Sequence, residues 1–181
     1  MKFFFVAAII GFLALPSQAQ FTKASLQASG LTCSMCSKAV QTALAKVPFV
    51  DKIDVDLKKQ EYNLTFKKDQ VVDFDALSKA VEDAGFSVAK LNVTADLSGM
   101  TATKDAHLKI GDAYFHFLNA ANQALSGSTS FNLVDKHFIS AKAFKKWSGA
   151  SKMECVQTGK AAGCCTSDGV SSGTRIYHAV I

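Results

Sequence analysis

Two closely spaced cysteines are the first residues in this sequence whose types could do chemistry together. Cys33 and Cys36 lie in the stretch GLTCSMC at residues 30–36. Such a pair can close a short disulfide, exchange disulfides with a substrate or hold a metal ion between two thiolates. Two soft thiolates on one turn suit a soft ion of low coordination number, such as Cu(I) or Hg(II). The surrounding sequence has to show which of these reactions the fold supports.

The apolar residues around the pair have the spacings that are typical of strands and helices. Apolar residues recur at every second position in four segments, which predicts four strands. Two further segments have helical spacing: one begins at Cys36 and ends before Pro48, and the other runs from Asp73 to Gly85. The predicted strands include residues 24–28, 53–57, 62–66 and 89–93. The order βαββαβ predicts an α+β, ferredoxin-like sandwich with two helices on one face of a four-stranded sheet.

This order places both cysteines in the turn between the first strand and the first helix. Cys36 would begin that helix, where unpaired backbone N–H groups and the positive end of the helix dipole favour an anion. A thiolate is such an anion, so we expect a lowered pKa for Cys33 or Cys36. An exposed turn would also leave a bound ion accessible to a second protein.

The stretch GLTCSMC, together with this element order, resembles the heavy-metal-associated domain of copper chaperones, copper-pump N-terminal domains and periplasmic mercury-binding proteins. The resemblance covers about residues 21–96 and implies that Cys33 and Cys36 are the two metal ligands. Leu31 stands where the family usually has a methionine that packs beneath the loop, so both ligands are retained. The segment EDAGF is similar to the stretch before the family's last strand, which implies that Phe86 lies near the metal loop.

The residues beside the cysteines bear on the choice of metal. Zinc and cadmium members of the family tend to resemble one another in carrying an acidic residue at the position of Thr32. The absence of an acidic residue there favours Cu(I) or Hg(II). Cu(I) is the expected ion, and Hg(II) and Zn(II) are kept as alternatives. Met35 offers a thioether between the ligands, but two adjacent positions on a turn rarely both face one ion.

Three other uses of the cysteine pair stay open on the sequence. Thioredoxin-like oxidoreductases resemble one another in a cis-proline opposite the cysteines, whereas the two prolines here, Pro16 and Pro48, stand elsewhere. A closed structural zinc site needs four ligands, of which the pair supplies two. A Cys33–Cys36 disulfide would be a reversible resting state in an oxidising compartment, because the loop that it closes is very short.

The second half of the chain shows no resemblance to a known family. Residues 97–106 are small and polar, which predicts a linker before a small β-rich domain at 107–181. Its predicted strands lie at 114–118, 130–134 and 175–181. A short helix is expected after Ser140, and a long Gly- and Ser-rich loop at 148–173. Such a domain would be a small barrel or a half-sandwich.

That loop contains Cys155, Cys164 and Cys165, for which two interpretations stay open. A disulfide from Cys155 to Cys164 or Cys165 would leave one thiol unpaired, as the odd number of cysteines requires. A second soft-metal site would combine these thiols with a histidine. The histidines have no ligand-like spacing from one another and are expected to be ordinary strand or surface residues. They are His107, His116, His137 and His178.

The N-terminus and the charge pattern indicate an exported protein. Residues 1–19 combine Lys2, an apolar run and the small residues SQA before Gln20, which predicts a signal peptide rather than a membrane anchor. The net charge of +5 comes with short, scattered lysine pairs and no basic stripe, so nucleic acid is not an expected partner. The chain has no nucleophile elbow, paired-carboxylate signature or phosphate loop, and no enzyme is predicted.

These observations predict a periplasmic metal-binding protein with a heavy-metal-associated domain at residues 20–96. Cys33 and Cys36 would bind one Cu(I), or Hg(II), and pass it by ligand exchange to a transporter or another envelope protein. No stable membrane insertion is expected after signal cleavage. Two alternatives are kept: an exported thiol–disulfide oxidoreductase, and a metal-responsive module that docks to an envelope transporter. The two halves are expected to fold separately.

Overall fold

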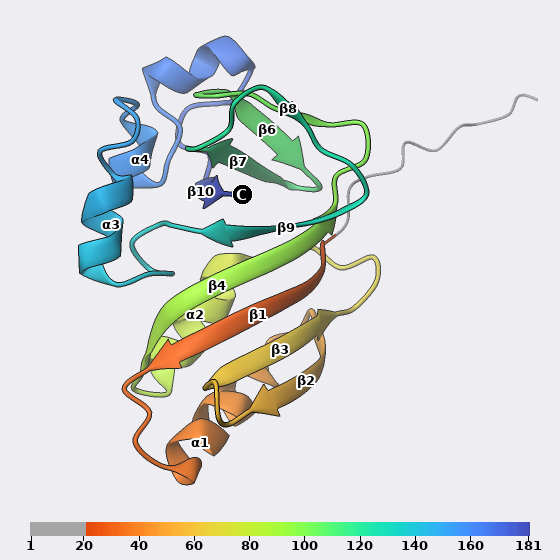
Figure 1. The fold of residues 1–181 in the computed structure, drawn as a ribbon, viewed down its shortest axis with the longest axis vertical. Coiled ribbons are helices and arrows are strands. Elements are labelled where there is room, and N and C mark those ends of the chain that lie inside the picture. Colours follow the sequence, from red (N-terminus) through yellow and green to blue (C-terminus); the bar gives the residue numbers. More distant parts are fainter. Residues whose placement is uncertain (1–20) are drawn as a thin grey trace, which may run out of the picture.

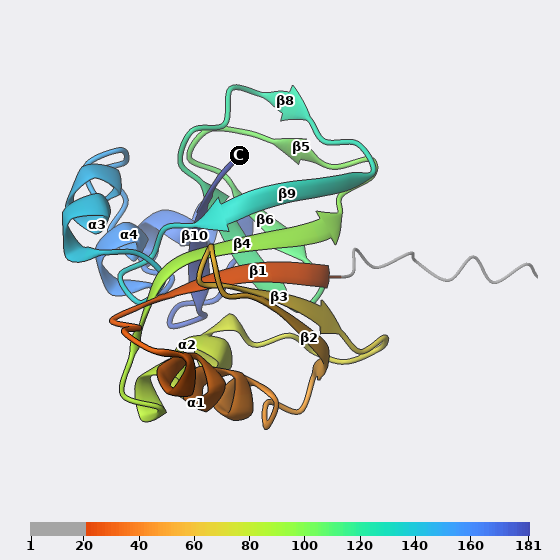
Figure 2. The ribbon, with the colours of Figure 1, turned by 60° about the horizontal axis from the view of Figure 1, so that its bottom comes forward.

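The computed structural model describes residues 21–181, and the predicted signal peptide at residues 1–19 lies outside the described residues. The first six elements are β1 (Phe21–Ser29), α1 (Ser34–Leu44), β2 (Val50–Asp56), β3 (Glu61–Phe66), α2 (Phe74–Asp83) and β4 (Ser87–Asp96). β1 pairs antiparallel with β3 and β4, and β2 pairs antiparallel with β3. Both helices cover one face of these strands (Figure 2). The predicted ferredoxin-like βαββαβ arrangement is confirmed.

The second half adds further strands and short helices. Its elements are β5 (Thr101–Ala102), β6 (His107–Ile110), β7 (Ala113–Phe117), β8 (Gln123–Ala124), β9 (Ser128–Leu133), α3 (Ala141–Trp147), α4 (Cys155–Thr158), the 3₁₀ helix η1 (Gly163–Asp168) and β10 (Ile176–Val180). Ser140 caps α3, because its hydroxyl accepts a hydrogen bond from the backbone N–H of Ala143. The predicted β-rich character of this half is confirmed.

The stretch 148–173, predicted as an unstructured loop, instead contains α4 and η1. These helices have 4 and 6 residues, which is too short for hydrophobic periodicity to reveal them. Each ends at a glycine with a positive φ, 69° at Gly159 and 73° at Gly169. Glycines that indicate a loop in the sequence therefore act as helix C-caps in the fold.

The longer strands of both halves form one eight-stranded sheet. Its order is β2-β3-β1-β4-β9-β10-β7-β6 (Figure 1). β9 joins the halves by pairing antiparallel with β4, from Leu91 opposite Leu133 to Asp96 opposite Ser128. The later strands therefore continue the first sheet from its β4 edge and do not form a separate barrel or half-sandwich. A four-stranded sheet would leave that edge unpaired.

The apolar core also crosses from one half to the other. The Phe74 ring, at the start of α2, packs edge-on against Tyr177 of β10 with 5.3 Å between ring centroids. Within residues 97–106, predicted as a linker, β5 pairs with β8 and Leu97 is buried. Independent folding of residues 20–96 stays a prediction, and these are contacts that such a fragment would lose.

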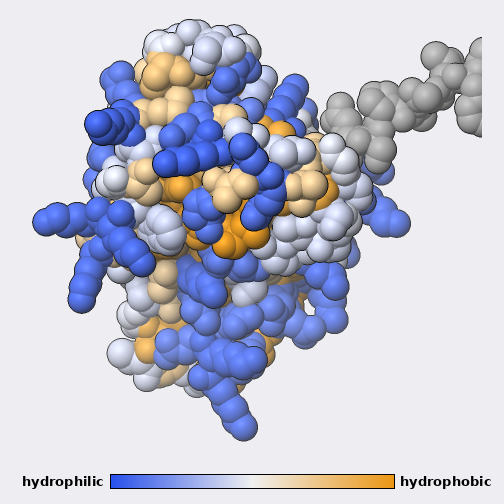
Figure 3. Space-filling model, turned by 45° about the horizontal axis from the view of Figure 1, so that its top comes forward, coloured by the Kyte–Doolittle hydropathy of each residue, from blue (hydrophilic) through white to orange (hydrophobic). Residues whose placement is uncertain are grey.

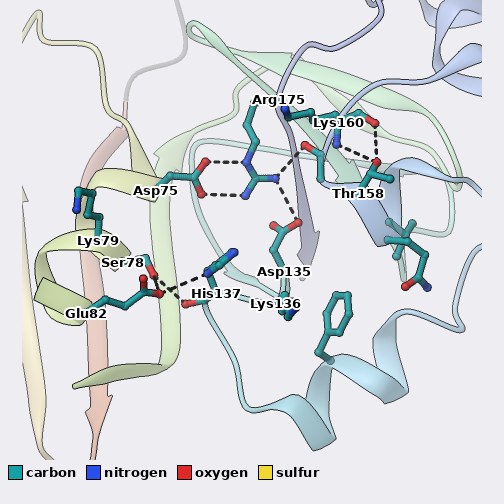
Figure 4. A pocket seen from close by; sticks show the side chains of 14 residues that line it. Asp75, Ser78, Lys79, Glu82, Asp135, Lys136, His137, Thr158, Lys160 and Arg175 are labelled. Carbon is teal, nitrogen blue, oxygen red and sulfur yellow. Dashed lines mark hydrogen bonds and ion pairs between the residues drawn. The ribbon is translucent and has the colours of Figure 1, made fainter. Parts of the chain in front are cut away.

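A charged contact joins α2 to the second half (Figure 4). Arg175 donates two hydrogen bonds to Asp75 of α2, Nε to Oδ2 at 2.7 Å and Nη2 to Oδ1 at 2.9 Å. Its third nitrogen, Nη1, lies 3.4 Å from Oδ1 of Asp135. Ser78 of α2 donates a hydrogen bond to the backbone carbonyl of His137 at 3.0 Å. These residues line a pocket of about 600 Å³ between α2 and the second half. The ion pairs of Arg175 in this pocket hold α2 against the second half.

One face of the molecule, seen in Figure 3, mixes apolar and polar side chains. Figure 3 turns the upper part of Figure 1 forward, and hydrophobic side chains appear there as patches with hydrophilic ones between them. In residues 21–181, no helix combines the length and the apolar character needed to cross a membrane. On the face in Figure 3, no single apolar surface dominates.

Candidate metal-binding loop

The loop between β1 and α1 holds the two predicted ligands. Gly30 follows β1 with a φ of 87°, a left-handed conformation that a residue without a side chain adopts easily. Cys33 is the N-cap of α1, and its Sγ accepts a hydrogen bond from the backbone N–H of Cys36 at 3.4 Å. The helix therefore begins at Ser34, and not at Cys36 as the sequence predicted. The reason is that a thiol takes the capping place usually held by a hydroxyl or carboxylate.

The two thiols face each other at the surface. The Sγ atoms of Cys33 and Cys36 are 2.9 Å apart, with Cys33 exposed and Cys36 half-buried. Two thiolates on opposite sides of one ion, each at about 2.3 Å, would lie about 4.6 Å apart. The pair must therefore open to admit an ion, and its position on an exposed turn gives room for that movement. A shallow cavity of about 240 Å³ beside Cys33, lined also by Leu57 and Gln60, gives further access.

The electrostatics of the loop favour one thiolate. The hydrogen bond from Cys33, followed by those from the Thr32 backbone and hydroxyl, lowers the pKa of Cys36 to about 7. The predicted lowering is thus confirmed for Cys36, with neighbouring donors as the main cause. The lowered pKa favours the thiolate of Cys36 near neutral pH, and the thiolate is the form that binds metals and attacks disulfides.

Phe86 and Leu31 support the loop from the side of the core. A Cβ placed on Gly30 would lie 3.7 Å from Cδ1 of Phe86, so that ring lies directly against the start of the loop. Leu31 packs partly buried against the same core, and Gln60 Nε2 donates a hydrogen bond to its carbonyl at 3.4 Å. Met35 is 77% exposed, so its side chain does not pack beneath Cys33 and Cys36.

A buried hydrogen bond fixes the first turn of α1 on the sheet. The hydroxyls of Ser37 and Tyr62 are 2.9 Å apart, and the Tyr62 hydroxyl also donates to the Ser37 carbonyl at 3.2 Å. Tyr62 is on β3 and is fully buried. The helix start, and with it the position of Cys36, is therefore held by the sheet, whereas Cys33 remains on the free turn.

The three later cysteines are also free thiols in the structure, each within the described residues. Cys155 and Cys165 are buried, and Cys164 is exposed. Cys155 Sγ lies 3.7 Å from Nε2 of His107 and 3.8 Å from Nδ1 of His116. The structure thus brings two histidines to this thiol, whereas the sequence predicted ordinary strand or surface positions for them.

The hairpin turn between these histidines is the feature of the sequence that could have revealed them. Gly111 and Asp112 form a two-residue turn between β6 and β7, which places His107 opposite His116. Burial, with the neighbouring His178 and His107, lowers the pKa of His116 to about 4, so its ring is neutral at physiological pH. Burial, with the neighbouring Cys165 and Cys164 thiols, raises the pKa of Cys155 far above its ordinary value.

The comparisons with known proteins concern the half of the chain that carries the first cysteine pair. The family model of the heavy-metal-associated domain matches residues 25–87. The mercuric transport protein periplasmic component of Serratia marcescens is 35% identical over 86 residues, which are 48% of this chain and 93% of that protein. The copper chaperone CopZ of Bacillus subtilis is 35% identical over 66 residues, which are 36% of this chain and 94% of that protein.

Solved structures match the same half. Oxidized MerP from Ralstonia metallidurans CH34 is 35% identical with a TM-score of 0.33, over 39% of this chain and 96% of that one. A structure of the CopZ metallochaperone is 26% identical with a TM-score of 0.34, over 38% of this chain and 100% of that one. The family model matches residues 25–87, and the chain is 35% identical to the mercuric transport protein and to the copper chaperone CopZ over nearly the whole length of each. The chain therefore belongs to the heavy-metal-associated domain family.

Proposed function

We propose that this protein is an exported carrier of a soft metal ion. Cys33 and Cys36 would bind one Cu(I), or alternatively one Hg(II), as two thiolates on the exposed loop. The ion would leave by ligand exchange: a thiolate of the acceptor protein enters to give a three-coordinate ion, and one of the two cysteines then departs. No electron is transferred, and the charge of each thiolate is conserved through the exchange.

The observation that carries this proposal is the pair of thiols in contact on an accessible helix start. Their sulfur atoms are 2.9 Å apart, and local donors lower the pKa of Cys36 to about 7. A closed site with four protein ligands would hold an ion but would not release it readily, whereas a two-ligand site leaves room for an incoming thiolate. The geometry therefore suits transfer better than permanent storage.

The choice of metal rests on the donors in the loop and on the relatives. Among residues 30–36, thiol sulfur is the soft donor that faces the helix start, and no carboxylate is present to supply the oxygen that Zn(II) accepts well. The similar proteins include a copper chaperone and a mercuric transport protein. We propose Cu(I) as the first candidate, Hg(II) as the second and Zn(II) as the weakest.

We further propose export and a protein acceptor. Residues 1–19 have the pattern of a signal peptide, and one relative is described as a periplasmic component. An acceptor in an envelope transporter fits the similarity to a Helicobacter pylori copper-transporting ATPase, which is 34% identical over 68 residues. That match covers 9% of the ATPase, so the likeness concerns a small domain of it. N-terminal sequencing of the protein from a cell-envelope fraction, with Gln20 as the expected first residue, tests the export.

Removal of either ligand should abolish tight binding at this loop. The reduced chain from residue 20 to 181 is titrated anaerobically with Cu(I), Hg(II) and Zn(II) against a competing chelator. We expect Cys33→Ser and Cys36→Ser each to lower the Cu(I) affinity of the loop by at least a hundredfold, because a two-ligand site has no spare donor. Cys164→Ser, which removes an exposed thiol elsewhere, is the matched control. Unchanged affinity in both loop variants would refute the assignment.

A thiol–disulfide oxidoreductase is the second candidate, and one observation favours it. Redox-active cysteine pairs also have two thiols in contact, one of which has a lowered pKa, and here that pKa is about 7 at Cys36. Insulin reduction by the reduced protein separates the two functions, since a metal carrier should be nearly inert. Turnover that disappears in Cys33→Ser, in protein freed of metal, would favour the oxidoreductase.

A further inference from the structure

Three histidines form a row across neighbouring strands of the second half. His107 on β6 lies opposite His116 on β7, and His116 lies opposite His178 on β10. Residues directly opposite each other on paired strands project to the same face of a sheet. The ring centroids are 5.2 Å apart for the first pair and 5.4 Å apart for the second. The register of the sheet thus gathers three imidazoles that are far apart in sequence.

Each histidine of this row has one ring nitrogen against an aspartate. The pairs are His107 Nδ1 with Asp168 at 2.7 Å, His116 Nε2 with Asp105 at 3.2 Å, and His178 Nδ1 with Asp135 at 2.8 Å. A carboxylate on one nitrogen fixes the tautomer and orients the ring, which leaves the other nitrogen as a metal donor. This arrangement is the usual support of a histidine that binds a metal.

Cys155 faces the open nitrogens of two of these rings. Its Sγ is 3.7 Å from His107 Nε2 and 3.8 Å from His116 Nδ1, and the three ligand atoms all lie within 4.8 Å of one another. A tetrahedral ion with a sulfur at about 2.3 Å and a nitrogen at about 2.1 Å holds them about 3.6 Å apart. The two sulfur–nitrogen distances therefore already correspond to ligands around one ion, before any side chain moves.

We propose that His107, His116 and Cys155 form a second metal site, distinct from the Cys33–Cys36 loop. One thiolate and two imidazoles are a donor set for a late transition-metal ion of borderline softness, in the class of Zn(II) or copper. Binding displaces the thiol proton of Cys155, which passes to solvent as the sulfur–metal bond forms. In Figure 1 the strands that carry these histidines lie at the opposite end of the molecule from α1, so each site has its own surroundings.

The side chains of all three ligands are fully buried, which distinguishes a metal site from a catalytic thiol. Cys155, His107 and Asp168 do follow the order of nucleophile, base and orienting carboxylate. A nucleophile, however, needs a substrate path, and the Cys155 residue is 0% exposed. His178, whose Nε2 is the one buried side-chain nitrogen or oxygen in residues 21–181 without a hydrogen-bond partner, lies beside His116 but outside this group of three ligands.

The test uses the reduced chain from residue 20 to 181 with Cys33→Ser and Cys36→Ser, so that the first site is absent. Zn(II), Cu(I) or Co(II) is added without oxygen, unbound ion is removed by gel filtration, and the retained metal is measured. We expect one ion per chain, and with Co(II) a thiolate-to-cobalt charge-transfer band. No retained metal, or Co(II) bound without that band, would overturn the proposal. Whichever of Zn(II) and Cu(I) competes better for the site identifies its preferred ion.

Variants of the same protein assign the ligands. Cys155→Ser is expected to remove the charge-transfer band, and His107→Ala and His116→Ala to lower Zn(II) affinity by at least a hundredfold. His137→Ala, which removes an exposed histidine outside the row, is the matched control. If the buried variants fail to fold, Asp168→Asn keeps every ligand and is expected to weaken binding about tenfold or more. Full affinity in both Asp168→Asn and Cys155→Ser would refute the site.

Discussion

At the scale of single residues, the chemistry of the first site depends on which thiol is ionised. Cys33 has two roles at once: its Sγ caps α1, and its hydrogen bond is the largest cause of the lowered pKa of Cys36. The sequence predicted the lowered pKa from the helix start alone. The larger contribution comes from the side chain three residues earlier and from Thr32, which no periodicity argument could reveal.

The pKa of Cys36 gives a testable pH dependence. The rate of alkylation at Cys36, followed by mass spectrometry in metal-free protein, should rise with a midpoint near pH 7. Cys33→Ala removes the main donor and should move this midpoint partway toward the ordinary value of about 8.5. Metal affinity should fall as the pH falls through 7, because protons then compete for the Cys36 sulfur. An identical midpoint in Cys33→Ala would show that the Cys33 contact does not set the pKa.

At the scale of elements, alternating apolar residues predicted β1 to β4, helical spacing predicted α1 and α2, and Asp73 does cap α2. These patterns could not predict the second site, because the sheet register pairs His107 with His116, and Cys155 reaches them from α4, outside the sheet. No sequence pattern marked Cys155 as a partner of these histidines, since α4 has 4 residues and no periodic pattern. His107 and His116 could have been paired from the Gly111–Asp112 turn, had β6 been recognised as a strand.

The glycine at the start of the metal loop gives a prediction at this scale. Gly30, directly after β1, and Gly85, directly after the C-terminal end of α2, have the same φ of 87°. An alanine at either position should cost about 1 kcal/mol of the free energy of unfolding, measured with denaturant, because its Cβ disfavours that conformation. Only Gly30→Ala should also weaken Cu(I) binding, because Gly85 lies outside the ligand loop. Equal Cu(I) affinities in both variants would show that the loop does not depend on its glycine.

At the scale of the whole molecule, the two halves share more than a connecting segment. β4 pairs with β9 over six residue positions, Phe74 packs on Tyr177, and Arg175 reaches Asp75 of α2. Each contact crosses from the family domain to the second half. The polar composition of residues 97–106 pointed to a linker, because composition reports local solubility and not which strand edges meet in space.

Because the two halves share one sheet, the fragment from residue 20 to 96 tests whether the first half folds without the second. Within this fragment, α1 buries Val40 and Leu44 and α2 buries Leu77 and Val81, which argues that the βαββαβ unit has a core of its own. The fragment would nevertheless expose the β4 edge and the part of Phe74 that Tyr177 covers. We therefore expect cooperative thermal unfolding of the fragment, with a Tm several degrees below that of residues 20–181, and binding of one soft ion. A fragment without a cooperative transition, by circular dichroism at the same concentration, would mean that the second half completes the fold of the metal domain.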